Sequence, residues 1–381
     1  EGGREEATTD LSYSPSEHVE RSWRWWSSIG SPTRVLAPMV NQSELAFRLL
    51  ARKHGAQLCY TPMLHAAMFA SEEPYRRDNF DVHESDRPLV VQFCGDDKHT
   101  LLAAALLAQG RCDAIELNCG CPQHIARRGH YGAFLLDEPE LIVSIVAHLA
   151  PRLKVPVLVK MRMLPPDEAT RAAEPPVSPA PSSRYRRTTD LALALEAAGC
   201  AVLTLHGRTR EQKTSVQCDW HAIAAVKAAL RIPVVANGGV GAPEEIEECL
   251  EATGADAVMS SEAALENPSI FSGKPTSRAV QWKLASEYIE LAQRYPPRCA
   301  SVAKAHLFKL LYMGLNAHPQ LREQLGEAME LAAVLDVGRA ACEAEAVEAA
   351  RLPDALATRC DHARAPYGSW YRRHRHDALP S

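Results

Sequence analysis

Residues 115–123, IELNCGCPQ, bring an amide and two thiols to the end of an apolar run. A thiol with an ordinary pKa of about 8.5 is protonated at neutral pH yet can release its proton, so Cys121 is a candidate acid catalyst. The plain alternative is a buried structural thiol, and packing is the role that we expect for Cys119. Zinc would need Cys112, Cys119, Cys121 and His124 together. A C-x-C pair departs from the C-x2-C spacing that suits tetrahedral zinc, so we expect no metal site.

Other apolar runs also end in polar residues. These ends are Pro38 and Met39, Gln92, Asn118, Lys160 with Arg162, His206 with Arg208, Asn237 with Gly238 and Gly239, and Ser260 with Ser261. Paired glycines and serines suit a phosphate, and amide, lysine and histidine donors suit the ring of flavin mononucleotide (FMN). A phosphosugar barrel would present a similar set, as would a pyridoxal phosphate barrel with Lys160 as the Schiff-base residue. Taken singly, Lys160 and His206 could be ordinary polar residues at strand ends.

The runs themselves form a regular series of eight predicted strands, with helical patterns between them. They cover residues 34–39, 57–63, 88–95, 113–120, 155–162, 201–208, 232–239 and 256–262. Continuous apolar runs of this length are typical of strands buried on both faces of a parallel sheet. Eight strands that alternate with helices predict a (β/α)8 TIM barrel, in which the polar ends share one rim. A doubly wound sheet is the alternative.

The rest of the chain divides around this barrel. We expect an N-terminal arm over residues 1–32 whose tryptophans pack on the body, the barrel over 33–275, a small all-helical domain over 276–352 and a basic tail over 353–381. Within the barrel, residues 165–188 begin with a stretch rich in Pro, Ala and Ser, which predicts a disordered insertion.

Composition limits the classes of function. A net charge of −5 gives no general attraction to nucleic acid, so any such binding needs a local basic patch. No apolar stretch reaches the about 18 residues of a membrane span. The 11 cysteines are odd in number and scattered, which predicts reduced thiols in an intracellular compartment. We expect a cytoplasmic monomer, with the nucleus as a second location.

Several stretches resemble the tRNA-dihydrouridine synthases in order and spacing. They are APMVNQSELAFRLLARKHGAQLCYTPML, VVQFCG, IELNCGCPQ, RRGHYGAFLL, HGRTREQK and VVANGG, with weaker similarity in KAHLFKLLYMGL. RRGHYGAFL beside NCGCPQ resembles the eukaryotic branch that modifies positions 16 and 17 of the D-loop. The resemblance implies an FMN enzyme, reduced by NADPH or NADH, that saturates the C5=C6 bond of uridine in tRNA. Hydride would pass from the flavin to C6, and a proton from the enzyme to C5.

Carried over by position, the resemblance makes Cys121 the proton donor. The residues that it implies for FMN binding are Pro38, Met39, Val40, Gln92, Asn118, Lys160, His206, Asn237, Gly238, Gly239, Ser261 and Glu262. Three features depart from the family pattern: Asn41 replaces Asp, the stretch TSVQCDW after EQK is short, and SSEAALENP replaces a more Gly-rich phosphate segment. Backbone amides approach a phosphate less freely without Gly, so the last departure bears on FMN affinity.

A tRNA substrate would need phosphate contacts around the barrel mouth, because the target base must be drawn out of its stacked loop. The expected RNA-binding residues are Arg127, Arg128, His130, Arg162, Arg208, Arg210 and Lys213. Lys304, His306 and Lys309 of the helical domain are expected to form a second clamp on the RNA.

Two other functions fit parts of the pattern. An FMN barrel that reduces a small pyrimidine or enone would leave the basic loops and the helical domain without a use. A flavin-free tRNA-binding relative would follow from the altered SSEAALENP segment.

Overall fold

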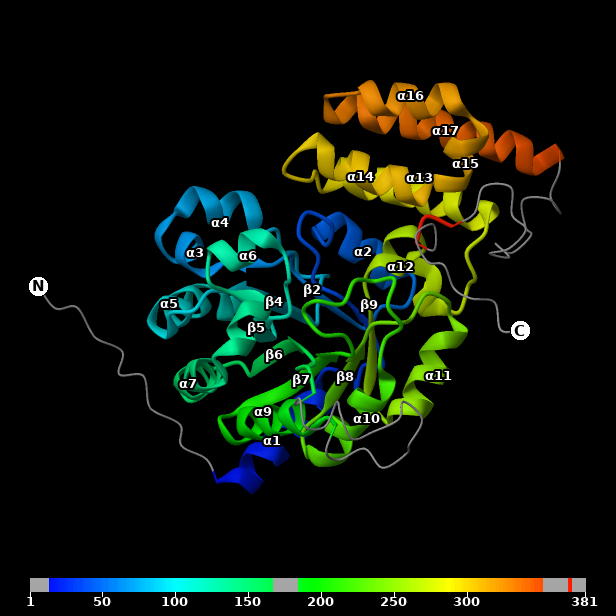
Figure 1. Ribbon diagram of the computed structural model, residues 1–381. Helices are drawn as coiled ribbons and strands as arrows, with labels where there is room; N and C mark the ends of the chain where they lie inside the picture. Colours follow the sequence, from blue (N-terminus) through cyan, green and yellow to red (C-terminus); the bar gives the residue numbers. More distant parts are fainter. Residues whose placement is uncertain (1–13, 167–183, 352–368, 372–381) are drawn as a thin grey trace, which may run out of the picture.

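Eight parallel strands close into a barrel in the computed structural model, which describes residues 14–166, 184–351 and 369–371 (Figure 1). The barrel strands are β1 (Arg34–Leu36), β2 (Leu58–Tyr60), β4 (Leu89–Cys94), β5 (Ala114–Cys119), β6 (Val157–Arg162), β7 (Cys200–His206), β8 (Val234–Asn237) and β9 (Ala257–Ser260). Each pairs with the next along the chain, and β9 pairs with β1 to close the ring. The short β3 (Leu64–His65) pairs only with the end of β4. The predicted (β/α)8 barrel is confirmed.

Successive side chains of each strand face the inside of the barrel and the surrounding helices in turn. On β5, Ala114 belongs to the cluster inside the barrel and Leu117 to the larger cluster that includes the helices. Because side chains alternate between the two faces, Glu116 and Asn118 point inward with Ala114. The same alternation turns a polar side chain inward near the ends of other strands, namely Gln92, Lys160, His206 and Asn237.

Helices follow the strands and cover the outside of the barrel (Figure 1). They are α2 (Leu45–Lys53), α3 (Ala66–Ser71), α4 (Glu73–Asn79), α5 (Lys98–Ala108), α6 (His124–Arg128), α7 (Pro139–Leu149), α9 (Arg186–Ala197), α10 (Trp220–Ala229), α11 (Glu244–Thr253) and α12 (Glu262–Glu266), with 3-10 helices at Gln109–Arg111, Gly132–Asp137 and Pro268–Ser272. Asp97 and Asp219 each accept a backbone N–H at the start of α5 and α10, which satisfies donors that the helix leaves open.

Helix α1 (Pro15–Ser28) closes the end of the barrel where the strands begin. Ser14 and Glu17 form a capping box that starts the helix. Trp26 is buried in the cluster inside the barrel, and the indole of Trp25 donates to the carbonyl of Asp113 (3.2 Å). The tryptophans of the predicted arm therefore pack on the body from a helix, while residues 1–13 lie outside the described residues.

Five helices follow the barrel and gather on one side of it: α13 (Arg278–Arg294), α14 (Ala300–Leu310), α15 (Tyr312–Ala317), α16 (Pro319–Glu327) and α17 (Leu331–Arg351) (Figure 1). Tyr288 of α13 and His306 of α14 both hydrogen-bond the buried carboxylate of Glu44, beside α2. This helical region thus meets the barrel through a buried polar contact. Its status as a separate domain stays a prediction.

The predicted insertion and tail fall mostly outside the described residues. Helix α9 begins at Arg186, inside the range 165–188 predicted to be disordered, so the last residues of that range are helical. Of the tail, only residues 369–371 are described. No helix within the described ranges is long and apolar enough to cross a membrane.

Candidate active site

A cavity of about 390 Å³ opens at the carboxyl ends of the barrel strands. Its lining contains Cys121 and every residue that the sequence predicts for cofactor binding: Pro38, Met39, Val40, Gln92, Asn118, Lys160, His206, Asn237, Gly238, Gly239, Ser261 and Glu262. The fold therefore gathers these residues from seven strands into one site. Their individual binding roles stay predictions.

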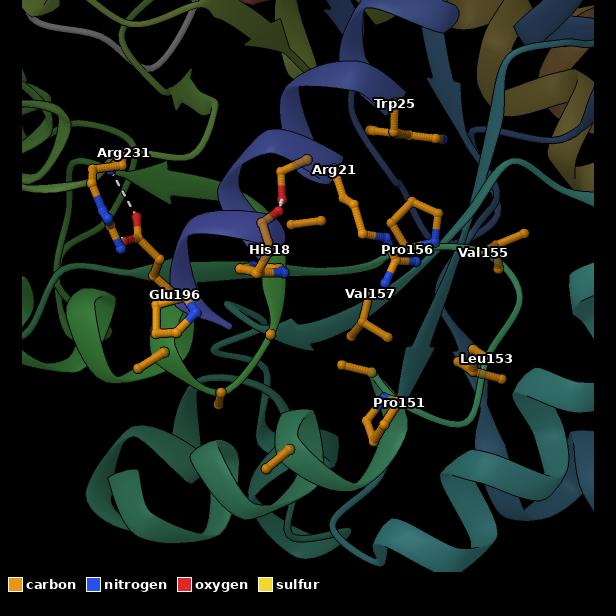
Figure 2. A pocket seen from close by; sticks show the side chains of 18 of the residues that line it. His18, Arg21, Trp25, Pro151, Leu153, Val155, Pro156, Val157, Glu196 and Arg231 are labelled. Carbon is orange, nitrogen blue, oxygen red and sulfur yellow. Dashed lines mark hydrogen bonds and ion pairs between the residues drawn. The ribbon is translucent and has the colours of Figure 1, made fainter. Parts of the chain in front are cut away.

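A larger cavity, of about 920 Å³, lies at the opposite end of the barrel among α1, α7 and α9 (Figure 2). His18, Arg21 and Trp25 line it from α1, and the Glu196–Arg231 ion pair lies on its wall. Its lining holds neither a thiol nor an amide side chain. Chemistry in (β/α)8 barrels occurs at the carboxyl ends of the strands, so the smaller cavity is the candidate active site.

A chain of hydrogen bonds runs from a buried carboxylate to the loop that carries Cys121. Gln92 Nε2 donates to Glu116 Oε2 (2.6 Å), and Asn118 Nδ2 donates to Gln92 Oε1 (2.8 Å). Asn118 Oδ1 then accepts the backbone N–H groups of Gly120 and Cys121 (3.0 Å each). Because the Gln92 amide donates to Glu116, its oxygen faces Asn118, and the oxygen of Asn118 is in turn directed at the turn that carries Cys121.

Burial shifts the ionisation of three groups in the site. It raises the pKa of Glu116 to about 7, against the hydrogen bond from Gln92 and the charge of Lys160. It lowers the pKa of Lys160 to about 8, although Glu116 opposes that shift. Burial and three neighbouring cations hold the pKa of His206 well below its usual range. The site therefore combines a neutral imidazole with a lysine that loses its proton unusually easily.

Arg162 and Arg208 line the cavity and are held by backbone carbonyls. Arg162 donates to the carbonyls of Gly120 and Thr209 (2.9 Å each). Arg208 donates to the Val216 carbonyl (2.6 Å) and lies 3.1 Å from Nε2 of the neutral His206. Arg162 is 8% exposed and Arg208 is 3% exposed. Both residues line the cavity, and their contact with RNA stays a prediction.

Two glycines after β8 give the site a wall of bare backbone. Gly238 (φ 103°) and Gly239 (φ 85°) both adopt the left-handed region that favours glycine. A Cβ on Gly238 would lie 2.7 Å from the ring of His206, and one on Gly239 would lie 3.0 Å from Nε1 of Trp220. A side chain would clash with these neighbours, so only glycine fits at either position, and both glycines line the cavity.

The segment SSEAALENP, which departs from the family pattern, leads from β9 into α12 at the same wall. Ser261 and Glu262 line the cavity beside the glycine pair. The hydroxyl of Ser260 is buried there and has no hydrogen-bond partner among the described residues. Two serines and two glycines at the ends of β8 and β9 form the kind of wall at which barrels of this class hold a phosphate.

The remaining cationic residues predicted to bind RNA lie around the cavity mouth, and they differ in whether a carboxylate contacts them. His130 lies between Asp96 (2.7 Å) and Glu138 (2.6 Å), and Arg210 pairs with Asp137 (2.7 Å). Arg127, Arg128 and Lys213 are exposed on α6 and on the loop after β7. Because His130 and Arg210 already contact carboxylates, the exposed three carry the available positive charge. Their contact with RNA stays a prediction.

The predicted second clamp is wrong at one residue. His306 is fully buried between Phe47 and Tyr288 and contacts Glu44, so it cannot reach an RNA surface. Lys309 is 6% exposed and lines the candidate active site. Of the three, Lys304 alone is not buried, with its side chain partly exposed.

Sequence reasoning missed several residues of the site. Glu116 carried a signal, since a charged residue stood inside an apolar run two positions before Asn118 and therefore on the same face. Lys309, Trp370 and Tyr371 line the cavity from distant parts of the chain, and no spacing in the sequence indicates their approach.

One cluster in the described part of the chain has the side chains of a metal site: His318, Glu345 and Glu348. Arg278 donates to both carboxylates at 2.6 Å, so a guanidinium already supplies their positive charge. The cysteines considered for zinc do not form such a cluster among the described residues.

Comparison with known proteins gives concordant matches. Residues 35–340 match the family described as Dihydrouridine synthase (Dus). A Mus musculus protein named tRNA-dihydrouridine(16/17) synthase [NAD(P)(+)]-like is 47% identical over 321 residues, which cover 83% of this chain and 63% of that protein. A Saccharomyces cerevisiae protein named tRNA-dihydrouridine(16/17) synthase [NAD(P)(+)] is 42% identical over 314 residues, 79% of this chain and 70% of that one.

A human protein named tRNA-dihydrouridine(20a/20b) synthase [NAD(P)+]-like is 34% identical over 270 residues, 70% of this chain and 79% of that one. The identity is thus higher to the two proteins named for positions 16 and 17. The chain spans less than two thirds of the length of the mouse relative.

Proposed function

This chain belongs to the dihydrouridine synthase family, and we propose that it reduces uridines of the tRNA D-loop, at positions 16 and 17, to 5,6-dihydrouridine. The observation that carries the proposal is the cavity at the carboxyl ends of the strands, which is lined by the Cys121 thiol, the neutral His206, the partly buried Lys160 and the Gly238–Gly239 backbone. The names of the relatives support the choice of tRNA as partner and of NADPH or NADH as reductant.

FMN is the cofactor that we propose. The residues present fit it: Gly238 and Gly239 line the cavity with backbone alone. The Ser260 hydroxyl of the same lining is buried without a hydrogen-bond partner among the described residues, which suits a phosphate. Lys160, His206 and the Gln92 amide offer cationic and neutral polar groups for the ring. When bound, FMN would supply the hydride for C6 of uracil.

The side chains of the site have separable tasks in this proposal. Cys121 holds the proton at its Sγ and delivers it to C5 of uracil. Asn118 positions the Cys121 loop by accepting two backbone N–H groups. Lys160 and Arg162 supply positive charge beside the reacting ring, and Arg162 also braces the loop through the Gly120 carbonyl.

Mapping of dihydrouridine in tRNA tests the proposal. Cells that lack this protein should lose dihydrouridine at positions 16 and 17, and the purified protein with FMN and NADPH should restore it to their isolated tRNA. Normal dihydrouridine at both positions in the deletion cells would refute the substrate. A purified protein that neither carries nor takes up flavin would refute the cofactor.

A further inference from the structure

A short C-terminal segment, residues 369–371, lies against α12 and forms part of the wall of the candidate active site (Figure 1, red). Trp370 and Tyr371 line the cavity together with Gly239, Ser261 and Lys309. The segment is more than 100 residues from α12 in sequence, so its position needs a physical cause.

The cause is Glu266, a carboxylate that is 1% exposed at the end of α12. It accepts the Ser369 hydroxyl (2.6 Å) and the backbone N–H groups of Trp370 and Tyr371 (3.0 Å each). Gln281 supplies a fourth donor (3.0 Å). A carboxylate has about four acceptor positions, and the segment supplies three donors to this one. Withdrawal of the segment would remove three hydrogen bonds from a buried carboxylate, which is unfavourable.

Side-chain packing reinforces this anchor. The Lys309 ammonium lies 5.1 Å from the centre of the Trp370 ring, a cation–π distance. A Cβ on Gly241 would lie 2.2 Å from Cε1 of Tyr371, so the ring packs directly on the backbone after the glycine pair. The Tyr371 ring therefore lies beside the turn that follows β8, and the Trp370 ring lies beside Lys309 of α14.

We propose that residues 369–371, held by Glu266, complete the phosphate end of the cofactor site, and that Lys309 is a cation for the ligand phosphate. This inference rests on the proposed FMN function and names residues that the family resemblance did not. The segment encloses the phosphate site beside SSEAALENP, where the chain has fewer glycines than the family pattern. Trp370 excludes water from one side of Lys309, which strengthens the attraction of its charge for a phosphate.

Two truncations test the segment. A chain that ends at Gly368 lacks it, whereas a matched chain that ends at Tyr371 keeps it and lacks only residues 372–381. Apo-protein would be titrated with FMN, with the quenching of flavin fluorescence as the readout. We expect the shorter chain to bind FMN at least about tenfold more weakly, and the matched chain to bind like the full chain. Equal affinity of the two truncated chains would overturn the proposal.

Point variants guard against a fold defect in the truncated chain. Tyr371→Ala in the full chain should weaken FMN binding while the far-UV circular dichroism of the apo-protein stays unchanged. Lys309→Met should weaken the binding of FMN but not that of riboflavin, which lacks the phosphate. Equal losses for both ligands, or none, would contradict the role of Lys309. If the full chain itself binds no FMN, the proposed cofactor fails; if it binds and the variants match it, only this inference fails.

Discussion

At the scale of residues, the two thiols of the β5 loop differ in their surroundings although one residue separates them. Cys119 ends the strand, is fully buried and packs in the outer cluster, where burial raises its pKa. Cys121 follows the turn that Asn118 holds, and it lines the cavity. A proton donor must reach the substrate, so only Cys121 has the position for that role.

We expect Cys121→Ala to abolish dihydrouridine formation, and Cys119→Ala to leave it active. The first change removes the proton for C5 but no group that holds the cofactor, so flavin absorbance should remain. The second removes a buried sulfur and should cost stability alone, about 1 kcal/mol. Flavin content and product formation, measured for both variants, check the pair. The opposite pattern of activities would reverse the assignment.

The lowered pKa of Lys160 predicts a pH dependence of cofactor binding. Its cation is present at pH 7 and is lost as the pH rises through about 8. We therefore expect FMN affinity to fall between pH 7 and 9. Lys160→Arg should remove this dependence, because an arginine side chain stays charged throughout. Titrations of apo-protein at several pH values provide the measurement, and an unchanged pH dependence in the variant would contradict the role of Lys160.

At the scale of elements, the barrel and the helical region meet through one polar contact. Glu44, at the start of α2, accepts from Tyr288 of α13 and His306 of α14 (2.9 Å each). Burial alone would raise the pKa of Glu44, but the charge of His306 and its hydrogen bond bring it below its usual value. The His306 ring also stacks on Phe47 of α2, with ring centres 4.4 Å apart. Hydrogen bonds to Glu44 and ring stacking on Phe47 therefore both hold the helical region against α2.

Glu44→Ala should lower the free energy of unfolding by about 3–5 kcal/mol, since it leaves buried donors on α13 and α14 without their acceptor. The folded-state pKa of Glu44 lies below that of the unfolded chain, so its contribution is present above about pH 4.3 and is lost as the pH falls through the lowered value. The difference between variant and wild type should accordingly shrink in acid.

Urea unfolding at neutral and acidic pH measures this difference. Glu248→Ala, an exposed glutamate on α11, is the control and should change stability by less than about 0.5 kcal/mol. A Glu44 variant as stable as the control would show that the contact contributes nothing.

At the scale of the whole molecule, attraction to RNA must be local, because the net charge is −5. Arg127 and Arg128 are exposed on α6, directly after the Cys121 loop and thus at the cavity mouth. Arg21 and Arg24 are equally exposed on α1, at the other end of the barrel. The two pairs offer the same charge at opposite ends.

Replacing Arg127 and Arg128 by Ala should raise the KM for tRNA with little change in kcat. It should also reduce the slope of log KM against log salt concentration by up to about 2, since two phosphate contacts are lost. The Arg21→Ala, Arg24→Ala double variant removes the same charge and should behave like the wild type. Equal effects of the two double variants would mean that net charge, not contact at the mouth, governs RNA binding.

Much of the fold and part of the site could be predicted because they depend on local order. Eight apolar runs, each buried on both faces, specify a closed parallel sheet. Alternation along a strand then places Asn118 and Lys160 on the inner face near the rim. His306, expected at an RNA-binding surface, is instead fully buried, because burial depends on the neighbours in space and a run of sequence letters does not record them.

The sequence by itself determined the barrel, the order of its strands and the polar residues at their ends, because the periodicity of buried side chains is a local property. Only the tertiary structure decided which polar and charged side chains lie in contact with one another. It placed Glu116 beside Gln92, buried Lys160 so that its pKa falls, and brought residues 369–371 to Glu266. These contacts join residues far apart in the chain, and their energies depend on the removal of water, which occurs only once the chain has closed around them.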